Sequence, residues 1–137
     1  MGEVATYYYL KTQYRNRHSE LRLLENNTGF ELYKNNMMII RVTWNNLQNE
    51  SYLPYDFVIE ENNSIKYIEV KSTPSDNKSQ VDFSRKEWDW MFKNMENYCI
   101  YRIFNVGKKN VRIEIIDSPA DLIIKGEIFL DQIKLLI

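Results

Sequence analysis

Residues 55–72 read YDFVIEENNSIKYIEVKS, and this stretch decides the fold that we expect for the chain. Two segments rich in β-branched and aromatic residues flank a polar Glu-Asn-Asn-Ser turn, a pattern typical of a β-hairpin. Alternate side chains of a strand lie on one face, so Glu69 and Lys71 point the same way. Twelve residues separate Asp56 from Glu69, and pairing of the two strands brings Asp56 beside the other two. We therefore expect two carboxylates and an ammonium group to meet on a sheet.

Such a set of groups suits the binding of a divalent metal ion and the activation of water against a phosphodiester. Asp56 and Glu69 are the candidate ligands, and Lys71 is the candidate for orienting the water and stabilising charge on the phosphoryl oxygens. An acidic residue between the apolar Ile68 and Val70 needs a partner or an ion. A structural alternative stays open for each residue: an exposed aspartate at a strand edge, and a salt bridge between Glu69 and Lys71.

The hairpin lies within a series of helices and strands that apolar spacing, turn residues and helix caps predict. In chain order we expect a helix at 3–17, a further helix at 18–26, strands at 37–44, 55–60 and 65–72, a helix from 84 to about 97, strands at 98–106 and 111–116, and a short helix at 120–125. Ser84 and Glu87 match a capping box. Residues 127–136 fit a strand as well as a helix. The order predicts an α/β or α+β fold in which helices flank a central mixed β-sheet.

The composition is that of a soluble globular domain. With 137 residues, 44% hydrophobic and 27% charged, the chain is long enough for one domain spanning 1–137 and too short for two. Apolar runs stay below the ~20 residues of a membrane helix, and the start lacks a signal peptide. We expect no membrane partner and a cytoplasmic location, or a nuclear one in a eukaryote. The net charge of −1 gives weak support to nucleic-acid binding, so charge placement matters more than the sum.

A single cysteine and a single histidine limit the metal chemistry of the chain. Cys99 alone excludes an internal disulfide, and its neighbours Tyr98 and Ile100 indicate a buried thiol on a strand. His18 and Cys99 do not make a Cys/His cluster, so zinc is not expected. Carboxylate and carbonyl oxygens instead suit Mg²⁺.

Further motifs accompany the hairpin along the chain. They are Gly2-Glu3, Tyr55-Asp56, Ile68-Glu69-Val70-Lys71-Ser72-Thr73, Phe83-Ser84 with Glu87-Trp88, and Tyr101-Arg102. Together they resemble the PD-(D/E)xK phosphodiesterase superfamily of restriction endonucleases and Holliday-junction resolvases. More closely, they resemble the domain at the C-terminus of the plant protein NO VEIN, which also occurs in bacterial helicase-like and restriction-associated proteins. The resemblance covers residues 2 to about 118 and implies a restriction-endonuclease-like core that can belong to a longer protein.

The resemblance implies a metal-dependent nuclease that hydrolyses DNA phosphodiester bonds in restriction or defence. Asp56, Glu69 and the backbone carbonyl of Val70 would hold Mg²⁺, for which Mn²⁺ substitutes, and Lys71 would act on the attacking water. Glu3 would add an acid to this metal site or support it. The plainer interpretation of Glu3 is a carboxylate that complements the dipole of the first helix. The alternative function is a non-catalytic module that binds nucleic acid or protein, because this domain is often an accessory to larger proteins.

Contacts to DNA are expected in the segment that follows the Glu-x-Lys motif. Lys78 and Gln80 lie in the loop, and Arg85 and Lys86 open the next helix, where phosphate contacts are favourable. Solvated surface charge is the alternative for each of them. Arg102 would reach either a carboxylate or DNA. The implied partners are DNA, with RNA as the alternative substrate, a second copy in a homodimer, and fused or associated helicase or restriction subunits.

Overall fold

The computed structural model of the protein describes residues 1–131, 135 and 137. Its helices and strands are α1 (Gly2–Arg17), β1 (Arg22–Asn26), β2 (Gly29–Lys34), β3 (Met37–Trp44), β4 (Phe57–Glu61), β5 (Ser64–Ser72), α2 (Arg85–Lys93), the 3-10 turn η1 (Met95–Asn97), β6 (Tyr98–Phe104), β7 (Arg112–Asp117) and α3 (Pro119–Ile124). The predicted α+β fold with a central mixed sheet is confirmed. No described helix is long and apolar enough to cross a membrane.

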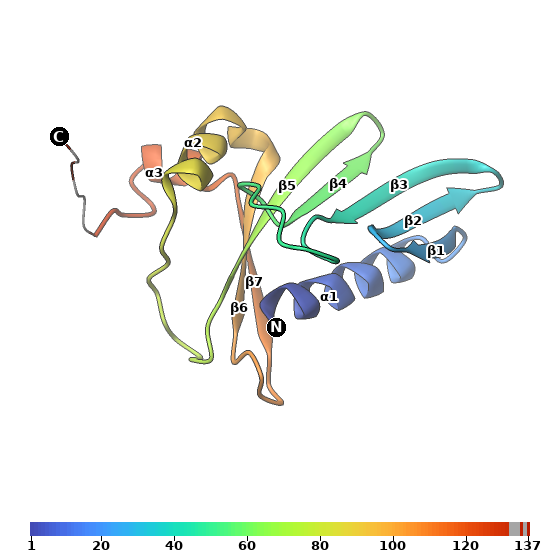
Figure 1. The fold of residues 1–137 in the computed structure, drawn as a ribbon, viewed down its shortest axis with the longest axis horizontal. Helices are drawn as coiled ribbons and strands as arrows, with labels where there is room; N and C mark the ends of the chain where they lie inside the picture. Colours follow the sequence, from blue (N-terminus) through green and yellow to red (C-terminus); the bar gives the residue numbers. More distant parts are fainter. Residues whose placement is uncertain (132–134, 136) are drawn as a thin grey trace.

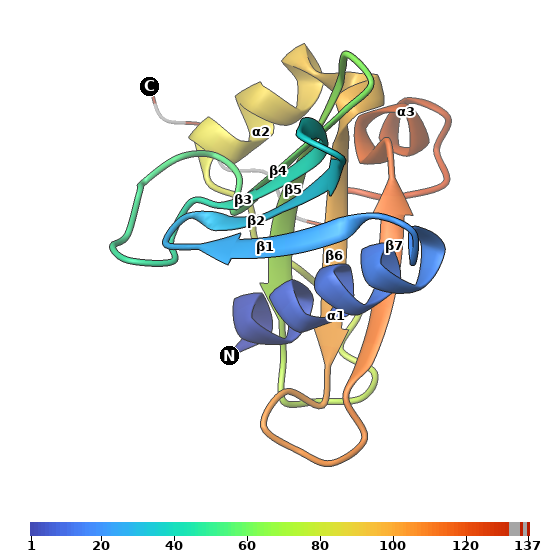
Figure 2. The same cartoon turned by 90° about the vertical axis from the view of Figure 1, so that its right-hand side faces the viewer.

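The seven strands form one sheet in chain order, from β1 to β7. All neighbours are antiparallel except β5 and β6, which are parallel and joined through α2. Helix α1 covers one face, and α2 and α3 lie on the other (Figure 1). Strands β1 to β4 curve over α1, which crosses β5 and β6 on the covered face (Figure 2).

Two apolar clusters hold the helices on the sheet. The larger cluster lies under α1 and includes the fully buried Phe57 and Ile68, and the smaller one lies under α2 and α3 around Tyr98. Side chains alternate between the two faces of β5, so Ile68 and Val70 pack in the larger cluster and Tyr67 packs against the smaller one. Glu69 and Lys71 therefore lie on the face that α2 covers, and the prediction that they point the same way is confirmed by the 3.3 Å between Lys71 Nζ and Glu69 Oε1.

The predicted helix at 18–26 is wrong, because this segment pairs as a strand. Helix α1 ends at Arg17, and residues 22–26 form β1, antiparallel to β2. Strand β2 starts at Gly29, where an added Cβ would lie 2.0 Å from the carbonyl oxygen of Val42, so only glycine permits this approach to β3. Leu23 and Leu24, whose apolar spacing predicted the helix, belong to a largely exposed edge strand. A sequence signal for β2 existed in the alternation of the fully buried Phe30 and Leu32 with more exposed neighbours.

The other boundaries follow the prediction closely. The hairpin of β4 and β5, the strand β3 and the short helix α3 are confirmed. The predicted capping box of Ser84 and Glu87 is present, but α2 ends at Lys93 and a 3-10 turn follows it. Cys99 is a buried strand thiol, as expected. Of the ambiguous segment 127–136, residues 132–134 and 136 lie outside the described residues, and the others form neither a helix nor a strand.

Candidate active site

Asp56 is fixed against β5 by its backbone and its carboxylate. It directly precedes β4, and its N–H donates to the carbonyl of Ile68 at 2.8 Å. Asp56 Oδ2 accepts from the Val70 N–H at 2.8 Å, and Oδ1 accepts from Asn46 Nδ2 at 2.9 Å. The carboxylate is half-buried rather than an exposed strand-edge group, and burial raises the pKa of Asp56 to about 6. These contacts bring Asp56 to the stretch of β5 that carries Glu69 and Lys71.

Glu69 and Lys71 form the salt bridge that the sequence left open as an alternative, and a third residue joins it. Glu69 is only 5% exposed, and Lys71 Nζ lies 3.1 Å from both carboxylate oxygens of Glu87. Burial, the hydrogen bond to Glu87 and the charge of Asp56 raise the pKa of Glu69. The pKa of Glu87 is lowered. Burial acts to raise it, but hydrogen bonds with Glu69, the Ser84 N–H and Lys71 lower it by more. The two pKa values shift in opposite directions, which makes Glu87 the more acidic group of the pair and the closer carboxylate partner of Lys71.

Glu87 was not predicted as a site residue, because its sequence context explains it as a helix cap. Its Oε2 accepts from the Ser84 N–H at 2.7 Å, which closes the capping box. The same carboxylate also reaches Lys71 across the space between α2 and β5. The capping box identified the residue, but only the packing of α2 on the sheet brings it to the site.

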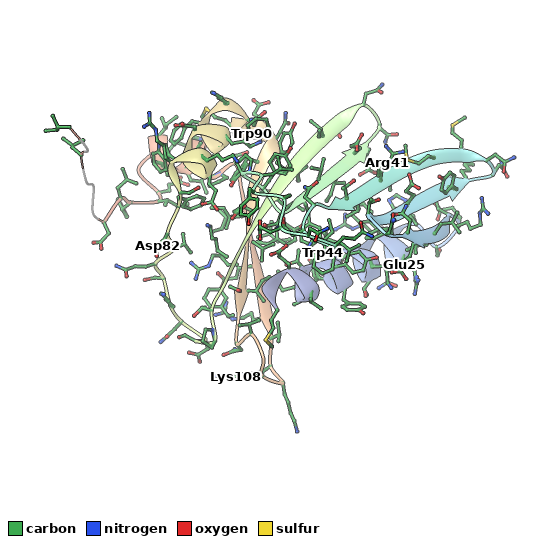
Figure 3. The ribbon with its side chains drawn as sticks, viewed as in Figure 1. Glu25, Arg41, Trp44, Asp82, Trp90 and Lys108 are labelled. Atoms are coloured by element: carbon green, nitrogen blue, oxygen red, sulfur yellow. The ribbon has the colours of Figure 1, made fainter. Side chains whose placement is uncertain are left out.

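Glu3 is joined to Asp56 through Asn46, which the sequence did not single out. Glu3 Oε1 accepts from Trp44 Nε1 at 2.8 Å and from Asn46 Nδ2 at 3.0 Å. Trp44 lies at the end of β3 above α1 (Figure 3) and stacks on Tyr7 with 5.2 Å between ring centroids. The charge of Glu3 also contributes to the raised pKa of Asp56, after burial. The structure thus brings Glu3 to the predicted site, where it supports Asp56 through a shared amide.

The four predicted nucleic-acid contacts divide into two pairs. Lys78 and Gln80 line a cavity of about 280 Å³ together with Lys71. Arg85 and Lys86 lie outside this cavity at the exposed start of α2. Arg85 is within 3.9 Å of Asp89, and the Lys86 ammonium donates to the carbonyl of Tyr52. The structure therefore brings one pair to the candidate site and leaves the other pair on the surface beside it.

Oxygen donors of the kind that Mg²⁺ binds are present, but they already have partners in the protein. Both oxygens of Asp56 accept hydrogen bonds, and Glu69 contacts Lys71 and Glu87. Within residues 1–131, 135 and 137, no group of three or more His, Cys, Asp or Glu side chains is arranged to hold a metal ion. Metal binding at Asp56, Glu69 and the Val70 carbonyl stays a prediction.

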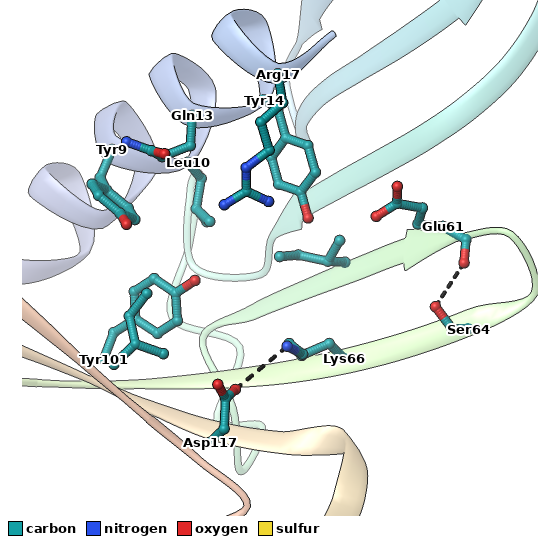
Figure 4. Close-up of a pocket in the computed structure, with 12 residues that line it drawn as sticks. Tyr9, Leu10, Gln13, Tyr14, Arg17, Glu61, Ser64, Lys66, Tyr101 and Asp117 are labelled. Carbon is teal, nitrogen blue, oxygen red and sulfur yellow. Dashed lines mark hydrogen bonds and ion pairs between the residues drawn. The ribbon is translucent and has the colours of Figure 1, made fainter.

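A second cavity of about 340 Å³ lies on the opposite face of the sheet, between α1 and the strands (Figure 4). Arg17 and Tyr14 of α1 face Glu61, Lys66 and Asp117 of the strands across it, and none of the predicted site residues lines it. Lys66 Nζ lies 3.4 Å from Asp117 Oδ1. This cavity is separate from the candidate active site.

Comparison with known families decides the affiliation of the chain. Residues 11–116 match the family described as "Protein NO VEIN, C-terminal". The chain belongs to this family. The match contains Asp56, Glu69, Lys71 and Glu87, whereas Glu3 precedes it.

The chain is similar to two NO VEIN relatives from Arabidopsis thaliana, and it spans only a small part of their length. The protein NO VEIN-LIKE is 39% identical over 70 residues, which are 50% of this chain and 10% of the relative. The protein NO VEIN is 33% identical over 88 residues, which are 64% of this chain and 3% of the relative. No solved structure matches the chain. The predicted NO VEIN family is thus confirmed, and membership in the wider nuclease superfamily stays a prediction.

Proposed function

We propose that this NO VEIN C-terminal domain is a metal-dependent nuclease of the PD-(D/E)xK superfamily that hydrolyses DNA phosphodiester bonds, in a restriction or defence role. The observation that carries the proposal is the hydrogen bond from the Val70 N–H to Asp56. It brings the first acid to the β5 segment where Glu69 and Lys71 share one face. The mixed sheet with helices on both faces is compatible with a restriction-endonuclease-like core.

The donor set of the site fits a hard divalent cation. Burial comes first among the causes that raise the pKa of both Asp56 and Glu69, and neighbouring carboxylates add to it. A site with this excess of acidic groups favours a cation with oxygen ligands and retained waters. Asp56, Glu69 and the carbonyl of Val70 would hold Mg²⁺ or Mn²⁺, which supplies Lewis-acid polarisation of the phosphodiester.

Lys71 is the residue that would act on the attacking water. Its ammonium group orients that water and stabilises the negative charge that develops on the phosphoryl oxygens. Glu87 holds Nζ at 3.1 Å from both carboxylate oxygens and thereby fixes the position of the long lysine side chain. We assign Glu87 to positioning Lys71, and Glu3 with Asn46 to positioning Asp56.

Cleavage of plasmid DNA in the presence of Mg²⁺ tests this proposal. We expect Asp56→Asn and Lys71→Arg to lower the cleavage rate by roughly a hundredfold or more, the magnitude typical of lost electrostatic or acid–base groups. Asp117→Asn is the matched control, because Asp117 is exposed and lines the cavity on the opposite face. Circular dichroism establishes that each variant is folded. Equal cleavage by the wild type and both site variants would overturn the mechanism.

The second candidate function is a non-catalytic module that binds nucleic acid or protein. It is favoured by the fact that Asp56, Glu69 and Lys71 already have partners within the chain. Fused or associated helicase or restriction subunits, or a second copy of the chain, would then be its partners. This function predicts DNA or protein binding that Mg²⁺ does not change and no cleavage under any metal condition.

A further inference from the structure

Arg102 is a buried cation for which the described part of the chain supplies no anionic partner. It lies on β6 with 5% of its surface exposed, and Nη2 donates to the carbonyl of Lys78 at 2.8 Å. Among the described residues Nε has no hydrogen-bond partner, and no carboxylate forms an ion pair with this guanidinium. Glu114 occupies the same register on β7, but its carboxylate pairs with Arg112. A buried charge is costly unless it is paired, so an anion in contact with Arg102 would offset this cost.

The described residues that line the cavity beside Arg102 include more cations than carboxylates. Arg102 lines the 280 Å³ cavity with Lys71 and Lys78, while Asp82 is the one carboxylate among the described residues that line it. Lys71 and Arg102 are direct neighbours in the parallel register of β5 and β6, where backbones lie about 4.8 Å apart. An anion held by Arg102 would therefore lie next to the ammonium group of the candidate active site.

We propose that this cavity binds a phosphodiester group of a nucleic-acid strand, adjacent to the phosphodiester that Lys71 faces. This inference rests on the proposed function, because a strand that passes Lys71 must place its neighbouring phosphates nearby. Arg102 lines the cavity, its Nε is buried without a hydrogen-bond partner among the described residues, and a planar guanidinium suits phosphate oxygens. Lys78 supplies a second cation from the segment before α2, and Phe104 supports the guanidinium with 4.9 Å from Cζ to the ring centroid.

Nuclear magnetic resonance of the arginine Nε–H groups tests binding without any catalytic readout. The probes are oligo-dT, inorganic phosphate, acetate and chloride, each added without divalent metal and at matched ionic strength. We expect the Arg102 Nε–H signal to shift saturably with oligo-dT and phosphate only, while the exposed Arg22 serves as the control signal. Equal shifts at Arg22, an equal response to acetate, or no shift at Arg102 would overturn the assignment.

Three variants extend the test to affinity. Lys78→Ala removes a charge from an exposed side chain, and its carbonyl still accepts from Arg102, so the fold is retained. We expect Lys78→Ala and Arg102→Lys each to weaken oligo-dT binding roughly tenfold in fluorescence anisotropy at low salt. Lys34→Ala, on the distant strand β2, is the matched control and should bind as the wild type does. If Arg102→Lys fails to fold, Lys78→Ala is compared with Lys34→Ala, and equal oligo-dT affinities of these two variants would overturn the assignment.

Failure of this inference is distinguishable from failure of the nuclease proposal. Saturable binding at Arg102 without cleavage would leave the phosphate site standing and overturn the nuclease proposal. Cleavage that needs Asp56 and Lys71, combined with unchanged oligo-dT affinity in Lys78→Ala, would overturn the phosphate site and leave the nuclease proposal standing.

Discussion

The carboxylate of Asp56 and the backbone N–H of Val70 are joined by a hydrogen bond of 2.8 Å, which connects the segment before β4 to the middle of the Glu-x-Lys motif. The donor is a main-chain group, so the position of Asp56 depends on the path of β5 rather than on a side-chain rotamer. Asn46 holds the other carboxylate oxygen and connects it to Glu3. The geometry of the site thus depends on one backbone amide and one side-chain amide.

Replacement of Asn46 by aspartate should destabilise the fold. The Asn46 amide donates to Glu3 and Asp56, and its Oδ1 accepts from the Ser51 N–H and hydroxyl. Asn46→Asp keeps the acceptor but puts a third carboxylate where the donor was. We expect a loss of about 1–3 kcal/mol in the free energy of unfolding, measured by urea denaturation without metal. Asn49→Asp is the control on the same segment, because Asn49 is exposed. Equal denaturation midpoints for the two variants would contradict this account.

Removal of the Lys71 charge should leave the half-buried Glu87 carboxylate without its cationic partner. Lys71 Nζ lies 3.3 Å from Glu69 and 3.1 Å from Glu87, and 17% of its side chain is accessible. Lys71→Met keeps the chain length and removes the cation, so we expect a loss of roughly 2–3 kcal/mol at pH 7 in urea denaturation. The double variant Lys71→Met/Glu87→Gln should recover part of this loss. No recovery would mean that packing, and not charge, accounts for the effect.

The start of α1 packs too closely on β5 for a larger residue at position 2. A Cβ added to Gly2 would lie 2.5 Å from the Cβ of Ser72 and 3.3 Å from Cγ1 of Val70. Gly2→Ala should therefore displace the helix start that carries Glu3 and cost about 1–3 kcal/mol in thermal or urea denaturation. Ser72→Gly removes the facing side chain, so Gly2→Ala/Ser72→Gly should be more stable than Gly2→Ala alone. An equally destabilised double variant would argue against this steric contact.

The local part of the site was predictable from the sequence, and the part that depends on packing was not. Alternation within residues 65–72 is a property of any strand, so the common face of Glu69 and Lys71 followed directly. Asn46 and Glu87 reach the site only through the end of β3 and the packing of α2. The sequence pattern explained Glu87 locally as a helix cap, and it did not single out Asn46.

The missed hairpin of β1 and β2 has a related cause. Strand β1 is exposed along most of its length, so its leucines follow no clear strand pattern. Its conformation is determined by pairing with β2, which in turn depends on the close approach of Gly29 to Val42. Such long-range pairing overrides the weak helical spacing of the local sequence.

Cys99 should be unreactive in the folded protein. Its side chain is fully buried on β6, and burial raises the pKa of the thiol to about 12. At pH 8 the reaction with a disulfide reagent should be slower than in the urea-unfolded chain by roughly a hundredfold or more. Because the unfolded thiol ionises near pH 8.5, the unfolded state binds fewer protons between about pH 8.5 and 12. This group therefore makes the fold less stable as pH rises through that window. Rapid labelling of the native protein would contradict its burial.

Divalent metal should stabilise the folded chain if the proposed site exists. A ligand that binds only the folded state adds RT ln(1 + [L]/Kd), which is about 2.7 kcal/mol at a hundred times Kd. We expect Mg²⁺ and Mn²⁺ to raise the melting temperature of the wild type by several degrees in a scanning calorimeter. In Asp56→Asn the amide oxygen still accepts from the Val70 N–H, but the ligand charge is gone, so the metal-dependent rise should vanish. Asp117→Asn alters an exposed aspartate on the other face and should retain the rise. Each variant is compared with its own metal-free melting temperature, which separates metal binding from intrinsic stability. An identical rise in all three proteins would place the metal elsewhere, and no rise in the wild type would favour the non-catalytic module.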